Sequence, residues 1–368
     1  MIQHRAFLDK GSIREGIAEL VRGLLLKAVV KDRPEPGVWL KEMPKPSPSS
    51  NEVLIRVKRA SICGSDIGIY EYTAAYSEFT KLPLILGHEF VGEVAEIGSD
   101  ALDFKIGDRV VAESVLSCGT CSYCRSGQTN LCLSFKVLGI HTNGGFSEYA
   151  SIPWRNVHHL RNELSFQEGS LIEPAAVACH AVLDGRLVQP MDFVTVIGPG
   201  PIGLMAAQIA RAAGCSRVFV VGIDVDEKRL AIAQDLGFET INSNHEDPVR
   251  KIRELTDGIG ADVVIVAVGA AQALSQACEL VRKGGKIHCV GIFSKPVELA
   301  VTSLVRKEVS LLGTFVSTWK NYEQAMTLAV NGKVNLKPLV THEFQIDQAV
   351  SAFDKAKSRE GCKVQFLI

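Results

Sequence analysis

The sequence predicts an α/β protein with two domains, a mainly β domain followed by a doubly wound parallel sheet. Three observations support this fold class. The chain has 368 residues, and a domain usually has about 150. Short β-type runs broken by Pro and Gly fill residues 23–150, whereas strands and helices alternate regularly after about Val182. The continuous Val and Ile runs of this second half are typical of parallel strands that are buried on both faces.

The composition is that of an ordinary globular protein. Hydrophobic residues make up 46% and charged residues 22%, which excludes collagen-like, mucin-like and disordered chains. Lys and Arg number 40 against 41 Asp and Glu, without a basic block, so no nucleic-acid partner is expected. The longest apolar windows, residues 193–210 and 263–273, contain Gly and Pro or are too short for a membrane span of about 20 residues. We expect a cytoplasmic protein.

The first 30 residues do not resemble a secretory signal, because charged residues interrupt every apolar stretch. The motif Ser12-Ile13-Arg14-Glu15 fits a capping box, and apolar residues recur there at helical spacing. These apolar residues are Ile13, Ile17, Leu20, Val21, Leu24 and Leu25. The segment is therefore predicted to be an amphipathic helix with a role in packing or subunit contact.

Four β-type runs predict strands of the first domain, and prolines predict an early hairpin. The runs are residues 53–57, 87–94, 109–112 and 145–152. Proline cannot donate to a sheet ladder, so it suits the edges and turns of sheets. The prolines that bracket the hairpin are Pro34, Pro36, Pro44, Pro46 and Pro48.

The second half of the chain is predicted to consist of strand and helix pairs. These pairs are residues 193–197 and 202–213, 217–223 and 227–236, and 261–268 and 271–281, with a further strand at 286–290. From about Phe315 the sequence predicts two more helices, at 322–330 and 346–356, and a final strand at 363–368. We find no internal repeat and no low-complexity tract.

A glycine motif predicts a dinucleotide site at the first of these pairs. Gly198-Pro199-Gly200-Pro201-Ile202-Gly203 follows a predicted strand and opens a helix. Glycines there permit a tight turn, a close approach of the backbone to pyrophosphate and helix-on-strand packing. The pyrophosphate would lie at the positive N-terminus of the helix.

The next strand carries a carboxylate that predicts NAD as the cofactor. Asp224 lies 21 residues beyond Gly203, where it would accept hydrogen bonds from both ribose hydroxyls and repel a 2′-phosphate. Arg229 is also expected among the cofactor-binding residues. Gly269 and Gly291 end later strands, and either let the nicotinamide half approach the backbone or are simple strand-to-loop glycines.

Four of the ten cysteines predict a structural zinc site. Cys118, Cys121, Cys124 and Cys132 form C-x₂-C-x₂-C-x₇-C in a loop rich in Gly and Ser, which suits a closed tetrahedral zinc. The main competitor is an iron–sulfur cluster, but the bacterial ferredoxin run has a three-residue last gap followed by Pro. A nucleic-acid finger is disfavoured because only Arg125 is basic in this lobe. Packed thiols are expected at Cys179, Cys215, Cys278, Cys289 and Cys362.

A second set of metal-ligating residue types is dispersed along the chain. It comprises Cys63, the pair His88-Glu89, and Glu173. Taken alone, each could equally be a core cysteine, a hydrogen-bonded histidine or a surface acid. His180 is expected to pack within a helix. His158 and His159 are not expected to bind metal, because adjacent side chains do not share a face.

Several motifs together resemble the zinc-dependent medium-chain dehydrogenase/reductase family, from about Gly23 to Ile368. They are Gly87-His88-Glu89 with Gly92, the four-cysteine lobe, residues 144–149, Ile172-Glu173-Pro174 and the glycine motif. Cys63-Gly64-Ser65-Asp66 and Ile172-Glu173-Pro174 are similar to the polyol (sorbitol-type) and L-threonine 3-dehydrogenase branch. Residues 69–72 and 136–140 are particularly similar to the threonine dehydrogenases.

The resemblance implies roles for the dispersed residues. Cys63, His88 and Glu173 would bind a catalytic zinc, with Glu89 as a fourth or exchanging ligand, and Asp66 would orient His88. Ser65 matches the hydroxyl of the proton relay, so Ser65 and Glu89 are the expected catalytic residues. Many relatives carry histidine five residues after the cysteine, whereas this chain has Gly68.

The resemblance also implies a domain organisation and an assembly. Residues 1–180, with residues 315–368 returning to them, would form a GroES-like catalytic zinc domain, and residues 181–314 an NAD-binding Rossmann domain. Family membership favours a homo-oligomer, specifically a tetramer.

The expected function is NAD(H)-dependent, zinc-dependent oxidation of a secondary alcohol in a small polyol or sugar-derived alcohol, with two Zn²⁺ per chain. An open zinc site lowers the pKa of a bound alcohol, and the hydride then goes to nicotinamide. One alternative substrate is L-threonine. An alternative of another class is a non-catalytic NAD-binding structural protein, which loss of Cys63, His88 or Glu173 would favour; none is lost.

Overall fold

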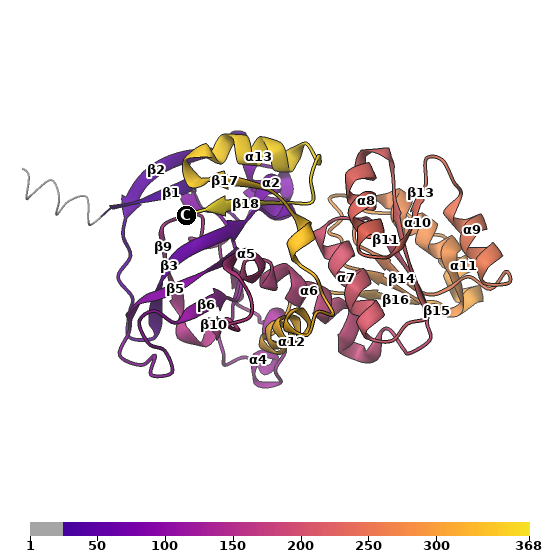
Figure 1. Cartoon of the computed structure of the whole chain (residues 1–368), viewed down its shortest axis with the longest axis horizontal. Coiled ribbons are helices and arrows are strands. Elements are labelled where there is room, and N and C mark those ends of the chain that lie inside the picture. Colours follow the sequence, from indigo (N-terminus) through magenta and orange to yellow (C-terminus); the bar gives the residue numbers. More distant parts are fainter. Residues whose placement is uncertain (1–24) are drawn as a thin grey trace, which may run out of the picture.

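The computed structural model describes residues 25–368, and the helix predicted from residue 12 falls almost wholly outside this range. The described chain forms two parts that lie side by side, each built on its own large sheet (Figure 1). At the outer end of the first part, β1 (Leu25–Lys31) pairs antiparallel with β2 (Trp39–Pro44), so the predicted early hairpin is confirmed. The short strand β4 (Leu84–Ile85) completes this three-stranded sheet.

The main sheet of the first part has the strand order β10-β6-β5-β3-β18-β17, and β9 pairs with β3 off this path. Its strands are β3 (Glu52–Ser61), β5 (Glu89–Ile97), β6 (Arg109–Ala112), β9 (Tyr149–Pro153), β10 (Val157–His159), β17 (Val340–Gln345) and β18 (Lys363–Leu367). The predicted runs 53–57 and 109–112 are confirmed as parts of β3 and β6, whereas the runs 87–94 and 145–152 are confirmed only from residues 89 and 149, where β5 and β9 begin. Strand β18 comes from the end of the chain and pairs antiparallel with β3, as the yellow and indigo ribbons in Figure 1 show.

The second part is a six-stranded parallel sheet with the order β13-β12-β11-β14-β15-β16. Its strands are β11 (Phe193–Ile197), β12 (Arg217–Gly222), β13 (Glu239–Asn242), β14 (Ala261–Val266), β15 (Val281–Cys289) and β16 (Ser310–Gly313). Its helices are α7 (Pro201–Ala212), α8 (Glu227–Asp235), α9 (Pro248–Leu255), α10 (Ala271–Leu280) and α11 (Val301–Lys307). The predicted doubly wound sheet is thereby confirmed. The strand order reverses between β11 and β14, and ligands of such sheets bind in the crevice at the carboxyl ends there.

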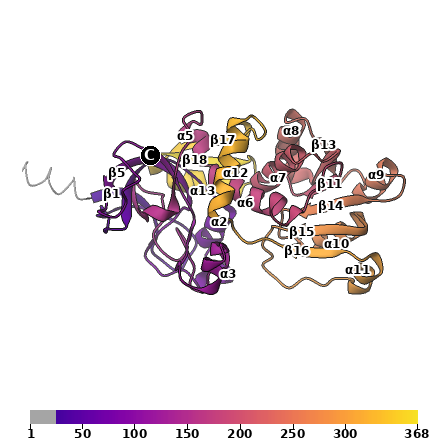
Figure 2. The same ribbon diagram turned by 90° about the horizontal axis from the view of Figure 1, so that it is seen from below.

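The remaining elements are short strands and helices that connect or cover the two sheets. The strand pair is β7 (Val115–Leu116) with β8 (Lys136–Val137). The helices are α2 (Gly64–Tyr70), α3 (Ala74–Ser77), α4 (Ser122–Arg125), α5 (Phe166–Gly169), α6 (Ile172–Leu183), α12 (Trp319–Val330) and α13 (Ala349–Lys357). Single 3₁₀ turns occur at Thr129–Leu131, Trp154–Asn156, Asp184–Arg186, Asp224–Asp226, Lys337–Leu339 and Ile346–Gln348. Figure 2 shows α3 beside α2, at the lower edge of the first part.

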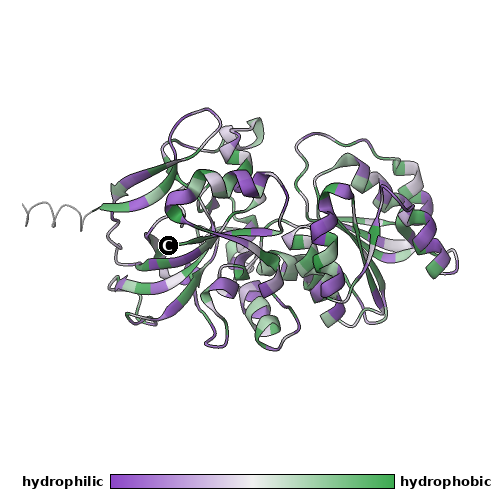
Figure 3. Ribbon diagram, turned by 45° about the horizontal axis from the view of Figure 1, so that its top comes forward, coloured by the Kyte–Doolittle hydropathy of each residue, from purple (hydrophilic) through white to green (hydrophobic). Residues whose placement is uncertain are grey.

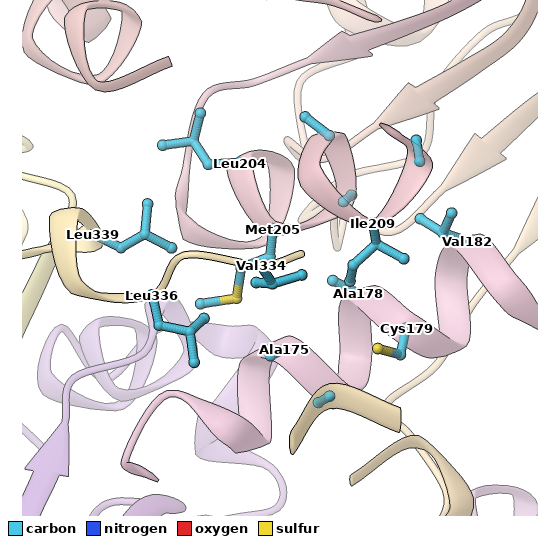
Figure 4. Packing of buried hydrophobic residues seen from close by; sticks show 14 of the residues in the cluster. Ala175, Ala178, Cys179, Val182, Leu204, Met205, Ile209, Val334, Leu336 and Leu339 are labelled. Atoms are coloured by element: carbon cyan, nitrogen blue, oxygen red, sulfur yellow. The ribbon is translucent and has the colours of Figure 1, made fainter. Parts of the chain in front are cut away.

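Helix α6 joins the two parts through a shared apolar core. Ala175, Ala178 and Val182 on α6 face Met205 and Ile209 on α7 (Figure 4). Small side chains on α6 let the two helices approach closely. The returning segment adds Val334, Leu336 and Leu339 to the same cluster. The predicted domain boundary at residue 180 therefore lies inside a packed helix.

Hydrophobic residues are frequent along the strands, above all in the parallel sheet, whose β11 and β14 consist almost entirely of buried residues (Figure 3). Among residues 25–368, no helix is long and apolar enough to cross a membrane.

Candidate active site

Three metal-ligating side chains meet at one end of the first sheet. Cys63 is the residue before α2 and lies two residues after the end of β3, and Glu89 begins β5, which pairs with β3 at Ser61. One ligand atom from each of Cys63, His88 and Glu89 lies within 4.8 Å of the other two. His88 and Glu89 are buried and Cys63 is half-buried, so a thiolate, an imidazole and a carboxylate converge in a site largely closed to water.

The position of His88 is fixed by the backbone of the preceding residue, Gly87, which packs against the ring of Phe146. The preceding Gly87 has a φ of +90°, and a Cβ there would lie 2.1 Å from the Phe146 ring. Only glycine fits this position, because the conformation and the space both exclude a side chain. The motifs around residues 87 and 146 therefore contact each other directly.

Asp66 lies behind His88, as the resemblance implied. Its Oδ1 is 3.9 Å from His88 Nδ1, and its Oδ2 accepts a 2.8 Å hydrogen bond from the Cys63 N–H. Burial lowers the pKa of His88, but the negative charges of Cys63 and Asp66 outweigh it and hold that pKa well above the usual value. Burial raises the pKa of Asp66. The imidazole thus lies among anions in a site that favours a cation.

Glu89 is paired with a buried lysine that sequence reasoning missed. Lys363 Nζ at the start of β18 lies 2.6 Å from Glu89 Oε1 and 2.5 Å from Oε2. Burial lowers the pKa of Lys363, but the Glu89 and Cys63 charges overcome that effect and raise it. No local motif marks Lys363, because its partner lies 274 residues away.

Glu173 lies near this group but outside the set of three mutually close ligand atoms. It is buried in the first turn of α6, where its Oε1 accepts a 2.6 Å hydrogen bond from Ser114 Oγ. The Ser114 N–H donates in turn to the Tyr322 hydroxyl at 3.0 Å. Burial raises the pKa of Glu173 while the His88 charge lowers it, so the carboxylate shares the electrostatic environment of the site.

Helix α2 presents the expected relay residue, and a tyrosine packs beside it. Ser65 is half-buried in the first turn of α2. A Cβ added at Gly68 would lie 2.4 Å from Cε2 of Tyr76, a residue of α3. Burial, and then the charges of Cys63 and Asp66, raise the pKa of Tyr76 to about 12. The sequence analysis did not identify Tyr76. Glycine at position 68 is the feature that could have indicated a large side chain packed against α2.

The four cysteines of the lobe converge around α4. All four Sγ atoms lie within 4.8 Å of one another, and all four cysteines are free thiols. Cys124 Sγ lies 3.9 Å from Cys118 Sγ and 3.5 Å from Cys121 Sγ. The edge of a tetrahedron with Zn–S bonds of about 2.3 Å is about 3.8 Å, so the spacing fits zinc. Hydrogen bonds from Thr120 lower the pKa of Cys118 to about 5, which favours the thiolate.

The glycine motif forms the turn between β11 and α7. Gly198 has a φ of +102°, and a Cβ on Gly203 would lie 2.0 Å from the Gly198 carbonyl oxygen. Gly200 caps α7, and an added Cβ there would meet nothing within 4 Å. Pro201 opens the helix and Ile202 follows it. The turn thus leaves open space in front of the helix N-terminus, where a pyrophosphate group would fit.

Asp224 lies just beyond β12, in a 3₁₀ turn, and its Oδ1 contacts Asn242 and His245. Arg229, which was also expected among the cofactor-binding residues, donates a 2.8 Å hydrogen bond to the Gly361 carbonyl of the first part. It also pairs with Asp226 at 3.5 Å.

Gly269 and Gly291 pack against each other's loops. A Cβ on Gly269 would lie 1.9 Å from the Ile292 carbonyl oxygen, and one on Gly291 would lie 2.4 Å from the Val268 carbonyl carbon. Both positions therefore require glycine for packing between the ends of β14 and β15.

The other histidines considered in the sequence analysis lie outside the group formed by Cys63, His88 and Glu89. His158 is buried between Glu113 and Glu323, at 2.8 and 3.0 Å, and stacks on Tyr322. His159 is exposed. His180 contacts Asp184 at 2.7 Å on α6. Burial raises the pKa of the remaining thiols, which are Cys179, Cys215, Cys278, Cys289 and Cys362.

Comparison with known proteins matches both parts of the chain. Residues 49–162 match the alcohol dehydrogenase GroES-like domain, and residues 201–331 match the zinc-binding dehydrogenase domain. The chain is 39% identical to sorbitol dehydrogenase of Halalkalibacterium halodurans, over 92% of this chain and 98% of that protein. It is 37% identical to L-threonine 3-dehydrogenase of Bacillus velezensis, with the same two coverages.

Solved structures of similar fold carry nicotinamide cofactors. A zinc-binding dehydrogenase of Sinorhizobium meliloti 1021 bound to NADP aligns with a TM-score of 0.85 and 28% identity, over 94% of this chain and 99% of that one. A short chain alcohol dehydrogenase of Escherichia coli CFT073 complexed with NADH aligns with a TM-score of 0.85 and 30% identity, over 94% and 100%.

Proposed function

The chain belongs to the zinc-dependent medium-chain dehydrogenase/reductase family, and on that premise we propose that it oxidises a secondary alcohol of a small polyol or sugar-derived alcohol. We further propose NAD as the hydride acceptor, because the Asp224 carboxylate lies where a 2′-phosphate would meet like charge.

The observation that carries this proposal is the convergence of Cys63, His88 and Glu89 in a largely buried site. A thiolate, an imidazole and a carboxylate are the ligand types of catalytic zinc, and the anionic surroundings of His88 favour a cation. Glu173 lies close enough for its charge to act on His88, and we assign it to the same metal. Zinc held there would supply Lewis acidity for the alcohol oxygen, and NAD at the glycine turn would accept the hydride.

The protein's own groups would position the substrate and move the proton. Ser65 Oγ, on the helix that Cys63 caps, would accept the alcohol proton and pass it toward cofactor ribose and water. Asp66 holds the Cys63 backbone and faces His88, so it fixes two proposed ligands together. A neighbouring hydroxyl of a polyol would bond Glu89 or a side chain near it, a second handle that ethanol lacks.

A second zinc is proposed for the four-cysteine lobe, which gives two Zn²⁺ per chain. Four mutually close sulfurs leave no open position for substrate, so this ion would act on stability rather than chemistry.

L-threonine remains the second candidate substrate, since an L-threonine 3-dehydrogenase is 37% identical over almost its whole length. The amino group of L-threonine would need a hydrogen-bond acceptor of the protein beside the reacting hydroxyl. Because Glu89 is already paired with the Lys363 ammonium, we favour a neutral second handle such as a hydroxyl.

The test is a substrate screen of purified, zinc-loaded enzyme with NAD against sorbitol, other polyols, sugar acids, L-threonine and ethanol. We expect a vicinal polyol to give the highest kcat/KM, and ethanol to react poorly. Ser65→Ala should slow the oxidation by about a hundredfold, as loss of a general acid–base step usually does. A kcat/KM for ethanol equal to that for every polyol and for L-threonine would contradict the proposed site. An unchanged oxidation rate in Ser65→Ala would contradict it as well. Turnover of no alcohol would favour the non-catalytic alternative.

We also propose a homo-oligomer, with the tetramer of the resemblance as the expected state. Strand β16 is an edge of the parallel sheet, and its Leu311 and Leu312 are 41% and 44% exposed. An exposed apolar edge strand can pair with the same strand of a second copy around a two-fold axis. Light scattering should give the mass of an oligomer for the wild type and a lower mass for Leu312→Lys.

A further inference from the structure

Two side chains hold one oxygen of the Asp224 carboxylate. Asn242 Nδ2 donates to Asp224 Oδ1 at 2.9 Å, and His245 Nε2 lies 2.7 Å from the same oxygen. Among the described residues, none donates to Oδ2 of Asp224. Both contacts come from the end of β13 and the loop after it, and β13 pairs with β12 at Gly222 and Asn242.

The orientation of the Asn242 amide is itself fixed. Its Oδ1 accepts a 3.0 Å hydrogen bond from the Asn244 N–H, so its Nδ2 faces Asp224. The His245 N–H donates at 3.0 Å to the Asn242 carbonyl, which keeps the imidazole beside the same carboxylate. The loop thus presents two side chains to a single oxygen.

This arrangement contributes little to the stability of the fold. His245 is 70% exposed and Asp224 57% exposed, and exposed ion pairs typically contribute less than about 1 kcal/mol. The two contacts instead fix the orientation of the Asp224 carboxylate. With Oδ1 held by the protein, Oδ2 is left to accept hydrogen bonds from a ligand.

We propose that His245, with Asn242, is a positioning residue that turns Asp224 Oδ2 toward the adenosine ribose of the cofactor. A carboxylate oriented before binding loses less conformational entropy when it accepts the ribose hydroxyls. This inference rests on the proposed NAD site, and it assigns part of the affinity for NAD to a residue that does not contact the cofactor.

The test measures Kd for NAD⁺ by tryptophan fluorescence on the full-length, zinc-loaded protein, without turnover. His245→Ala should weaken NAD⁺ binding by about fivefold, the usual effect of one hydrogen bond, and His245→Gln should retain most of the affinity. The matched control is His159→Ala, an exposed histidine 3.8 Å from Asp108 in the other part of the chain, which should leave Kd unchanged.

A double-variant cycle separates positioning from direct contact. In an Asp224→Ala background, His245→Ala should have no further effect on Kd, because it acts only through the carboxylate. Equal effects in both backgrounds would mean that the imidazole contacts the cofactor itself, and would overturn the proposal. If Asp224→Ala weakens NAD⁺ but His245→Ala does not, this inference fails alone; if neither does, the proposed cofactor site fails with it.

Discussion

The ring of Tyr76 occupies the space that any side chain at Gly68 would need. A Cβ at Gly68 would lie 2.4 and 2.5 Å from two ring carbons, Cε2 and Cδ2. The sequence shows only that Gly68 stands where many relatives carry histidine. In the structure, the ring of Tyr76 from the neighbouring helix α3 fills the space beside Gly68.

Gly68→His should therefore destabilise the protein instead of only changing the proton path. Overpacking typically costs about 1–3 kcal/mol, and the free energy of unfolding in urea would measure it. Adding Tyr76→Ala should recover part of the loss by opening the space. A single variant as stable as the wild type would show that Tyr76 moves aside freely.

The two proposed metal sites should differ in the effect of losing one thiol. Cys63→Ala should abolish turnover and leave the melting curve close to that of the wild type, because an open site contributes chemistry. Cys118→Ser should lower the melting temperature or the solubility, since a closed thiolate site contributes folding energy. Elemental analysis should find about two zinc ions per wild-type chain and about one in each variant. Identical melting curves with wild-type zinc content in both variants would contradict the assignment.

Breaking the buried pair of Lys363 and Glu89 should be costly. Lys363→Met leaves a buried carboxylate without its cation, which typically destabilises by about 3–5 kcal/mol. The matched control is Lys58→Met, which removes a half-buried 3.1 Å pair between Lys58 on β3 and Glu93 on β5. Its expected cost is about 0–1 kcal/mol. Adding Glu89→Gln to Lys363→Met should recover stability. Urea unfolding of the four proteins measures these differences, and equal costs for both lysines would refute the expectation.

His288 should make the stability fall in weak acid. Burial, and then the charge of His180, lower its pKa from 6.5 to about 4 in the folded chain. Between these two values the unfolded chain binds the proton more readily, so this stability contribution is complete above pH 6.5 and is lost as the pH falls to 4. The loss amounts to about 3 kcal/mol, at 1.36 kcal/mol per pH unit.

Unfolding free energies measured in urea from pH 7 to pH 4 test this expectation. His288→Gln should flatten the dependence, whereas Thr314→Val removes only the hydroxyl that contacts the imidazole and should retain it. The same slope in His288→Gln and the wild type would assign the acid sensitivity to other groups.

The sequence predicts those features that depend on residues close together in the chain. The glycine turn before α7 and the four-cysteine lobe each lie within a short segment, so spacing alone reports their geometry. Convergence of Cys63 with His88 and Glu89 followed only from family resemblance, because chain distance gives no contact. Lys363 was missed for the same reason.

Some secondary structure was also missed. Strand β13 has only four residues, ETIN, with no apolar run, and helix α9 is mostly charged on its exposed side. Strand β17 alternates half-buried and exposed residues and has no turn motif to mark it. Their structure depends on pairing with neighbouring strands and helices, which a single sequence does not display.

The place of β18 between β3 and β17 has a consequence for the order in which the chain is completed on the ribosome. All six strands of the parallel sheet have been synthesised by residue 313, whereas the first sheet waits for residues 363–367. Domains generally fold as units during synthesis. The part with the parallel sheet can therefore fold on a nascent chain whose β3 still has an open edge, and Glu89 gains its buried counter-charge only after Lys363 has been added.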